Sequence, residues 1–211
     1  MTLNSKFTKH VMAGLFASAG LLGMAAQAQT VDPAVQAVMK NSFREQGIAK
    51  LDRIEQDEFQ KLCSDEAFYA SKEGQQKAIA LQEKALKEIK PPSDGKYLGD
   101  WKAGEAIAQS GRGFTWTDSL KTVNGGGCYN CHQITKEEIS FGTIGPSLLG
   151  YGKMRGNSQP IIEYTWNRIN NSKAYNACSN MPRMAHFNLL TEQQMKDVMA
   201  LLLDPASPVN Q

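Results

Sequence analysis

The sequence of 211 residues predicts an all-α protein with long loops. Apolar residues recur at helical spacing in several segments, and these segments begin at residue types that cap helix N-termini. No segment alternates convincingly between apolar and polar residues, and no internal repeat is visible, so we expect no sheet. Hydrophobic residues make up 41% of the chain and charged residues 21%, a composition that excludes a wholly disordered protein.

Residues 1–28 have the pattern of a cleaved export signal. Lys6 and Lys9 precede an almost continuously apolar run at residues 11–26, and Ala26-Gln27-Ala28 is a small-x-small cleavage site. The run is shorter than the roughly 20 residues of a membrane span, so we expect a periplasmic protein with no span in its mature form. Without the two lysines, the mature chain carries 21 basic and 21 acidic residues. This balance argues against nucleic-acid binding.

Residues 29–92 predict a helical N-terminal extension. Asp32-Pro33 is a good helix start, with an acidic cap followed by proline at the first helical position. A second helix is expected from about Leu51 to Leu62 and a third from Gln75 to Lys90, where Pro91-Pro92 stops it. No chemical motif occurs in this segment, so we expect it to pack on the main domain or on a partner.

Residues 93–211 predict a second unit. Asp100 can cap a helix that reaches about Ser110, and a glycine-rich loop follows. Another helix is expected at residues 161–170. Thr191-Glu192-Gln193-Gln194 is a capping box before a final helix that ends at Asp204-Pro205. Four apolar residues of this last helix recur at helical spacing: Met195, Val198, Met199 and Leu202.

The chemistry of the chain is carried by Cys128-Tyr129-Asn130-Cys131-His132, which has the C-x-x-C-H spacing of covalent haem c attachment. Two thiols at this spacing can each form a thioether with a haem vinyl group, and the adjacent histidine then lies under the iron. A thioredoxin-like C-x-x-C is an alternative, although it needs a βαβ setting. A zinc site would need four ligands, which Cys128, Cys131, His132 and His186 could supply.

The sixth iron ligand must come from elsewhere in the chain. A thioether is the usual partner of histidine in electron-transfer cytochromes c, and it raises the reduction potential. Met181, in Asn180-Met181-Pro182, is the candidate, because it lies in a loop that can reach over the haem. Met184 and His186 are local alternatives. Met195 and Met199 are expected in the core, because they follow the apolar stripe of a helix.

The order of these motifs resembles class I cytochrome c over about residues 98–204. The resemblance rests on C-x-x-C-H, on Gly145-Pro146-Ser147-Leu148, on the Met181-Pro182 pair and on the amphipathic C-terminal helix. It implies a class I cytochrome c-like domain at residues 93–211. It further implies that Met181 binds iron opposite His132 and that the carbonyl of Pro146 orients the histidine ring.

Longer stretches are similar to the SoxX family of monohaem cytochromes. They are GRGFTW from Gly111, GGGCYNCHQI from Gly125, FGTIGPSLLGYG from Phe141, CSNMPR from Cys178 and DVMALLLDPASPVN from Asp197. This resemblance implies one His/Met-ligated haem c and a complex with the cytochrome SoxA. That SoxAX complex is an L-cysteine S-thiosulfotransferase, which joins thiosulfate oxidatively to a cysteine of the carrier SoxYZ.

The same resemblance places the sulfur chemistry on SoxA, so this chain would accept electrons and pass them to a small soluble cytochrome c. Catalytic residues are then expected on the partner and none on this chain. Two other classes stay open, a free-standing electron carrier and a haem enzyme such as a peroxidase.

Cys63 and Cys178 remain after the haem motif is assigned. An even number of cysteines in an exported protein favours a disulfide between them. The alternative is two separate thiols, buried or bridging to a partner.

Overall fold

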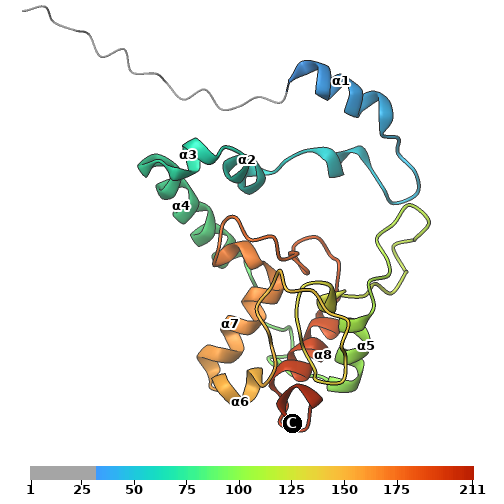
Figure 1. Ribbon diagram of the computed structural model, residues 1–211, viewed down its shortest axis with the longest axis vertical. Helices are drawn as coiled ribbons and strands as arrows, with labels where there is room; N and C mark the ends of the chain where they lie inside the picture. The colour runs from blue at the N-terminus through green and yellow to red at the C-terminus, as the bar shows by residue number, and fades with distance from the viewer. Residues whose placement is uncertain (1–31) are drawn as a thin grey trace, which may run out of the picture.

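A computed structural model describes residues 32–211 (Figure 1). The predicted export signal at residues 1–28 lies outside the described part. The helices are α1 (Pro33–Ser42), α2 (Glu58–Ser64), α3 (Glu66–Ala70), α4 (Lys72–Glu88), α5 (Trp101–Gln109), α6 (Tyr151–Arg155), α7 (Gln159–Asn170) and α8 (Glu192–Leu203). Short 3-10 turns occur at Leu51–Ile54, Cys128–Asn130, Ser172–Ala174 and Pro208–Asn210. The predicted all-α class is confirmed, since residues 32–211 contain no strand beyond one isolated bridge.

The helix predicted from Leu51 to Leu62 is wrong as one continuous element. A single 3-10 turn at Leu51–Ile54 is followed by an extended break, and α2 begins only after Asp57. The carboxylate of Asp57 accepts a bond from the backbone N–H of Gln60, and the Gln60 side chain accepts one from the backbone N–H of Asp57. This reciprocal cap fixes a new helix start where apolar spacing alone suggested continuity.

Helices α5 and α8 cross at Gly104, and this crossing is the centre of the main core. A Cβ at Gly104 would lie 2.1 Å from the carbonyl oxygen of Asp197, so the close approach of the two backbones requires glycine. Asp197 also accepts a bond from the backbone N–H of Asp100, at 2.9 Å, and so joins the start of α5 to α8. Met195 and Met199 are buried in this core, as expected.

The extension packs on the body of its own chain. A second apolar cluster combines α2 and α4 with the segment after α7; its buried members are Phe59, Leu62, Ala78, Leu81, Ala85, Ala174 and Ala177. Trp166 of α7 is 2% exposed and donates to the carbonyl of Lys90, just beyond α4. The extension therefore covers the segment between α7 and α8, whereas α1 buries none of its residues.

A third contact joins the extension to the loop between α5 and the cysteine motif. Arg53 donates to the carbonyl of Phe114 at 2.9 Å, and its guanidinium lies 4.4 Å from the centroid of the Phe114 ring. Gly47 approaches the same loop so closely that a Cβ would lie 2.2 Å from the carbonyl oxygen of Trp116. None of the helices within residues 32–211 has the length and hydropathy that crossing a bilayer requires.

Candidate functional site

The cysteine motif is positioned by glycines that lie against the end of α5. Gly126 and Gly127 donate backbone bonds of 2.8 Å to the carbonyls of Ile107 and Ser110. Gly127 adopts the left-handed conformation, with φ 57°, and the 3-10 turn at Cys128–Asn130 follows directly. Because these glycines turn the chain next to the helix, the motif is held at the edge of the α5–α8 core.

His132 is oriented by a backbone carbonyl, as the family resemblance implies. Its Nδ1 lies 2.8 Å from the carbonyl oxygen of Pro146. A carbonyl can only accept, so Nδ1 carries the proton and Nε2 is left with a free lone pair. Gly145 lies against the ring, since a Cβ there would be 2.2 Å from Cε1. The arrangement leaves Nε2 ready to act as a metal ligand.

The two motif cysteines are free and partly buried. Burial raises the pKa of the Cys128 thiol to about 11. A thioredoxin-like motif depends on the opposite effect, a thiol pKa that a helix N-terminus or a nearby positive charge lowers. Both thiols are thus available for thioether bonds, and the histidine next to them supplies the donor that a haem iron takes. The donor set fits haem c.

The four donors considered for zinc are not gathered. Within residues 32–211 no group of three or more His, Cys, Asp or Glu side chains is arranged to hold a metal ion. His186 is exposed and packs edge-on against the ring of Phe187, at 4.8 Å between centroids. Although the residue as a whole is exposed, partial desolvation of its ring by neighbouring atoms and the nearby charge of Arg183 lower the pKa of His186.

Met181 and Met184 differ in how they pack. Met181 is half-buried and packs against the same core cluster as Cys128, at its edge. Its carbonyl accepts a 2.6 Å bond from the Ser172 hydroxyl, which holds the backbone of the loop. Met184 is 5% exposed and lies among the buried members of that cluster. Among the three candidate ligands, Met184 is thus enclosed in the core and His186 is exposed, whereas Met181 lies at the edge of the core.

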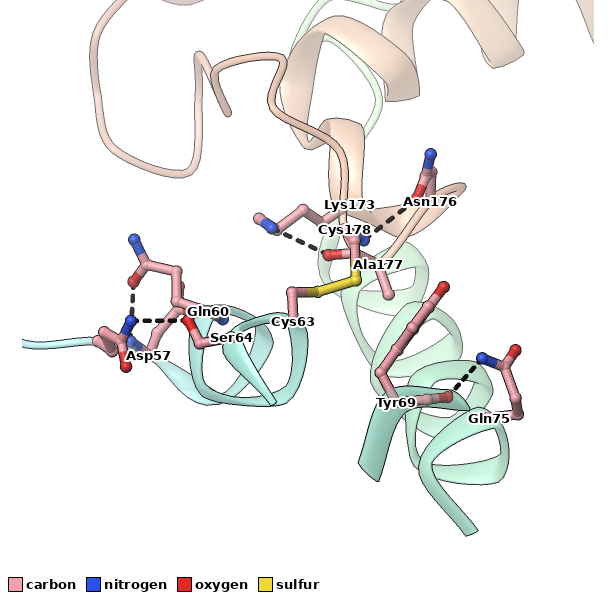
Figure 2. Close-up of a disulfide and its surroundings, with 11 residues drawn as sticks. Asp57, Gln60, Cys63, Ser64, Tyr69, Gln75, Lys173, Asn176, Ala177 and Cys178 are labelled. Carbon is pink, nitrogen blue, oxygen red and sulfur yellow. Dashed lines mark hydrogen bonds between the residues drawn. A yellow bond between two sulfur atoms is a disulfide. The ribbon is translucent and has the colours of Figure 1, made fainter. Parts of the chain in front are cut away.

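Cys63 and Cys178 form a disulfide, with 5.5 Å between their Cα atoms (Figure 2). It joins α2 to the segment that precedes Met181. Figure 2 also shows Lys173, whose Nζ donates to the carbonyl of Ala177 at 2.9 Å. The four cysteines of the chain are thus divided into one disulfide and one free pair.

Sequence reasoning missed a polar contact between the motif and α5. The hydroxyl of Tyr129 donates to Glu105 of α5 at 2.8 Å and lies 2.9 Å from the Thr135 hydroxyl. Burial and the Glu105 carboxylate raise the pKa of Tyr129, which keeps this phenol protonated. Nothing in the spacing around Glu105 marks it, because the residue it meets lies 24 positions further along the chain.

Ion pairing between the extension and the Met181 loop was also missed. Arg183, 4% exposed, pairs with Asp57, the cap of α2. The guanidinium of Arg183 also lies 4.4 Å from the centroid of the Phe187 ring. Arg183 and Asp57 are 126 positions apart in the sequence, so no local pattern could have paired them.

Comparison with known proteins agrees with the site. The family described as Cytochrome c matches residues 120–204, which include the cysteine motif, Pro146 and Met181. The chain is 35% identical over 208 residues to a protein of Aquifex aeolicus (strain VF5) that is named an uncharacterized lipoprotein. That alignment covers 95% of this chain and 98% of the relative.

Proposed function

We propose that the chain is the electron-transfer subunit of a SoxAX-type complex, because stretches such as GGGCYNCHQI from Gly125 and CSNMPR from Cys178 are similar to SoxX. The chain belongs to the same family as the Aquifex lipoprotein and contains a cytochrome c domain. The cytochrome c domain makes the chain an electron-transfer protein with covalently bound haem c. The proposal adds the complex, its thiosulfate chemistry and the number and ligation of haem.

The observation that carries the haem assignment is the contact between His132 Nδ1 and the Pro146 carbonyl. It fixes the ring and its tautomer, so that Nε2 faces away from the backbone as a ligand. We assign the second iron ligand to Met181, because it packs at the edge of the same core cluster as Cys128 and its backbone carbonyl is held by the Ser172 hydroxyl. Haem c held by His132 and Met181 would supply one-electron chemistry, and these two side chains would leave no coordination position for a substrate.

The cysteine inventory supports a relay role over a catalytic one. Cys63 and Cys178 are joined to each other, and Cys128 and Cys131 are reserved for haem. No cysteine is left to act as a nucleophile toward sulfur compounds. Joining a thiolate to thiosulfate forms one S–S bond and releases two electrons. On this proposal the bond forms at SoxA and SoxYZ, and the present chain carries the electrons, one at a time, to a small soluble cytochrome.

Several features support a location outside the cytoplasm. Structural disulfides persist in oxidising compartments such as the periplasm. The export pattern of residues 1–28 agrees with this, as does the relative that is named a lipoprotein.

The loops on either side of the cysteine motif expose apolar side chains that a partner could cover. These side chains are Leu120, Val123, Ile139 and Ile144.

A free-standing electron carrier is the second candidate. It is favoured by the way the extension packs on its own chain: five of its apolar residues are buried in one cluster with Ala174 and Ala177, namely Phe59, Leu62, Ala78, Leu81 and Ala85.

The two candidates are separated by recovering the mature protein from the periplasm of its source grown on thiosulfate. Haem staining and mass spectrometry then identify what accompanies it, and the mass of the mature chain counts its haems. Recovery of a second c-type cytochrome with a cysteine-ligated haem supports the SoxAX-type complex. Recovery of a lone, redox-active monomer favours the free carrier and contradicts the complex.

A further inference from the structure

Helix α2 is bonded to the Met181 loop at two points, one on each side of the methionine. Cys63, near the end of α2, is joined to Cys178, three residues before Met181. Asp57, the N-cap of α2, pairs with Arg183, two residues after it. Together these two links, Cys63–Cys178 and Asp57–Arg183, form what we call the α2 bracket. A single seven-residue helix thus spans the segment that carries the assigned iron ligand.

Each oxygen of Asp57 has its own partner, so the cap and the ion pair are built by one side chain. Oδ1 accepts the backbone N–H of Gln60 at 2.9 Å, and Oδ2 accepts the guanidinium of Arg183. Burial of Asp57 opposes ionisation, but the bonds from Gln60 and Arg183 and the charges of Arg183 and Lys173 keep the pKa of its carboxyl below the ordinary value. Arg183 is buried, so losing this partner would leave an uncompensated charge.

The disulfide side of the bracket is also braced. Lys173, 8% exposed, donates to the carbonyl of Ala177, next to Cys178. Its Nζ lies 5.6 Å from the centroid of the Phe59 ring on α2. The backbone N–H of Cys178 donates to the side chain of Asn176 (Figure 2). By contrast, the Met181 backbone itself bonds to nearby serines of the same stretch of chain: its carbonyl accepts from the Ser172 hydroxyl, and its N–H donates to the Ser179 hydroxyl.

We propose that the α2 bracket holds Met181 in position as iron ligand and that Asp57 is a positioning residue for it. This inference rests on the proposed ligation by Met181. A loop fixed at residues 178 and 183 can withdraw its side chain from iron only by small local motions. A loop released at either point samples open conformations more often, and those open conformations leave the sixth position free.

The test measures how readily imidazole replaces Met181 on the ferric haem of the intact holoprotein. The first variant is Asp57→Asn, which keeps a good helix cap but loses the charge that faces Arg183. The second is the double variant Cys63→Ser/Cys178→Ser. The matched control is Asp94→Asn, because Asp94 also accepts a local backbone N–H, from Lys96, with one oxygen and pairs with a mostly buried cation, Lys196, through the other.

We expect imidazole to bind roughly tenfold more tightly to each bracket variant than to the wild type, because its apparent affinity follows the population of the open state. The ferric absorption band of the methionine–iron bond should weaken, and amide hydrogen exchange at residues 179–187 should quicken. The Asp94→Asn control should bind imidazole as the wild type does. Bracket variants that match this control in imidazole affinity, band intensity and exchange would overturn the proposal.

Met181→Ala separates this inference from the proposed ligation. Loss of the methionine–iron band in this variant establishes Met181 as the ligand. Bracket variants that then behave like the wild type refute the role of the bracket but not the ligation. An unchanged band refutes ligation by Met181, and the bracket inference falls with it. If the double cysteine variant fails to fold, the wild type is treated with a thiol reductant and carbon monoxide binding to the ferrous haem is measured instead. Faster binding after reduction is expected, and an unchanged rate contradicts the proposal.

Discussion

Replacing Gly145 by alanine should disturb His132, the proposed haem ligand. The added methyl group would lie 2.2 Å from Cε1 and 2.5 Å from Nδ1 of His132, whereas ordinary van der Waals contact begins at 3.4 Å. The ring or the loop must therefore withdraw by about 1.2 Å, the difference between 2.2 and 3.4 Å. The loop is held by a 2.8 Å bond from the Gly145 N–H to the Cys131 carbonyl. Movement of the loop therefore weakens this bond, and movement of the ring weakens the bond from His132 to Pro146.

Two effects contribute to the expected loss of stability in Gly145→Ala. Overpacking of this kind costs about 1–3 kcal/mol. Withdrawal of the ring also stretches the 2.8 Å bond from Nδ1 to Pro146 beyond bonding range, which costs about 1 kcal/mol more. We expect the free energy of unfolding of the Gly145→Ala holoprotein to fall by roughly 2–4 kcal/mol. The midpoint potential should shift as well, because the ligand loses the acceptor that makes it a better donor.

The assay is denaturant unfolding of the holoprotein followed by haem absorbance, together with a redox titration. Gly111→Ala is the control, since a Cβ at Gly111 meets only the Asn130 side chain, at 3.6 Å, and its backbone φ is ordinary. A Gly145→Ala protein with the stability and midpoint potential of the Gly111→Ala protein would refute the reasoning about His132.

Three further predictions concern stability. Gly104→Ala should lower the free energy of unfolding by about 1–3 kcal/mol in thermal denaturation, because its Cβ would lie 2.1 Å from the Asp197 carbonyl oxygen; an unchanged Tm would contradict the close helix crossing. The double variant Cys63→Ser/Cys178→Ser should lower the free energy of unfolding by up to about 5 kcal/mol in denaturant unfolding, because the disulfide joins residues 115 positions apart. A variant as stable as the oxidised wild type would argue against this bond. Asp57 has a lowered pKa, so the stability that it contributes is present above its ordinary value of 3.8 and is lost as pH falls through the lower folded value. Acid unfolding should therefore show the advantage of the wild type over Asp57→Asn shrinking below pH 3.8, and an advantage independent of pH there would contradict the ion pair.

Local signals predicted much of the fold. Asp32, Asp100 and Thr191 cap α1, α5 and α8 as their residue types indicated, because an N-cap acts over only three positions. The same locality explains the error at residues 51–62, where the apolar spacing hid the cap at Asp57. The short helices α3 and α6 were missed, since five residues give too few turns for a periodic pattern.

In the candidate site, too, local patterns predicted some residues, whereas others depend on contacts between distant parts of the chain. The C-x-x-C-H spacing marks Cys128, Cys131 and His132, because covalent attachment needs neighbouring residues. Pro146 came from a family resemblance, and the structure does bring its carbonyl to His132. Arg183 and Glu105 could not be found in either way, because each depends on a partner that only the folded chain brings near.

The burial of Cys128 has a consequence for how the chain matures. Burial raises its pKa to about 11, so at neutral pH a smaller fraction is present as thiolate than for an unperturbed thiol. Disulfide exchange proceeds through thiolates, and its rate falls with that fraction. In the folded chain, Cys128 is thus a slow competitor for the oxidation that joins Cys63 to Cys178. Four cysteines could pair in three ways, and this difference in reactivity disfavours any mispairing that would consume Cys128.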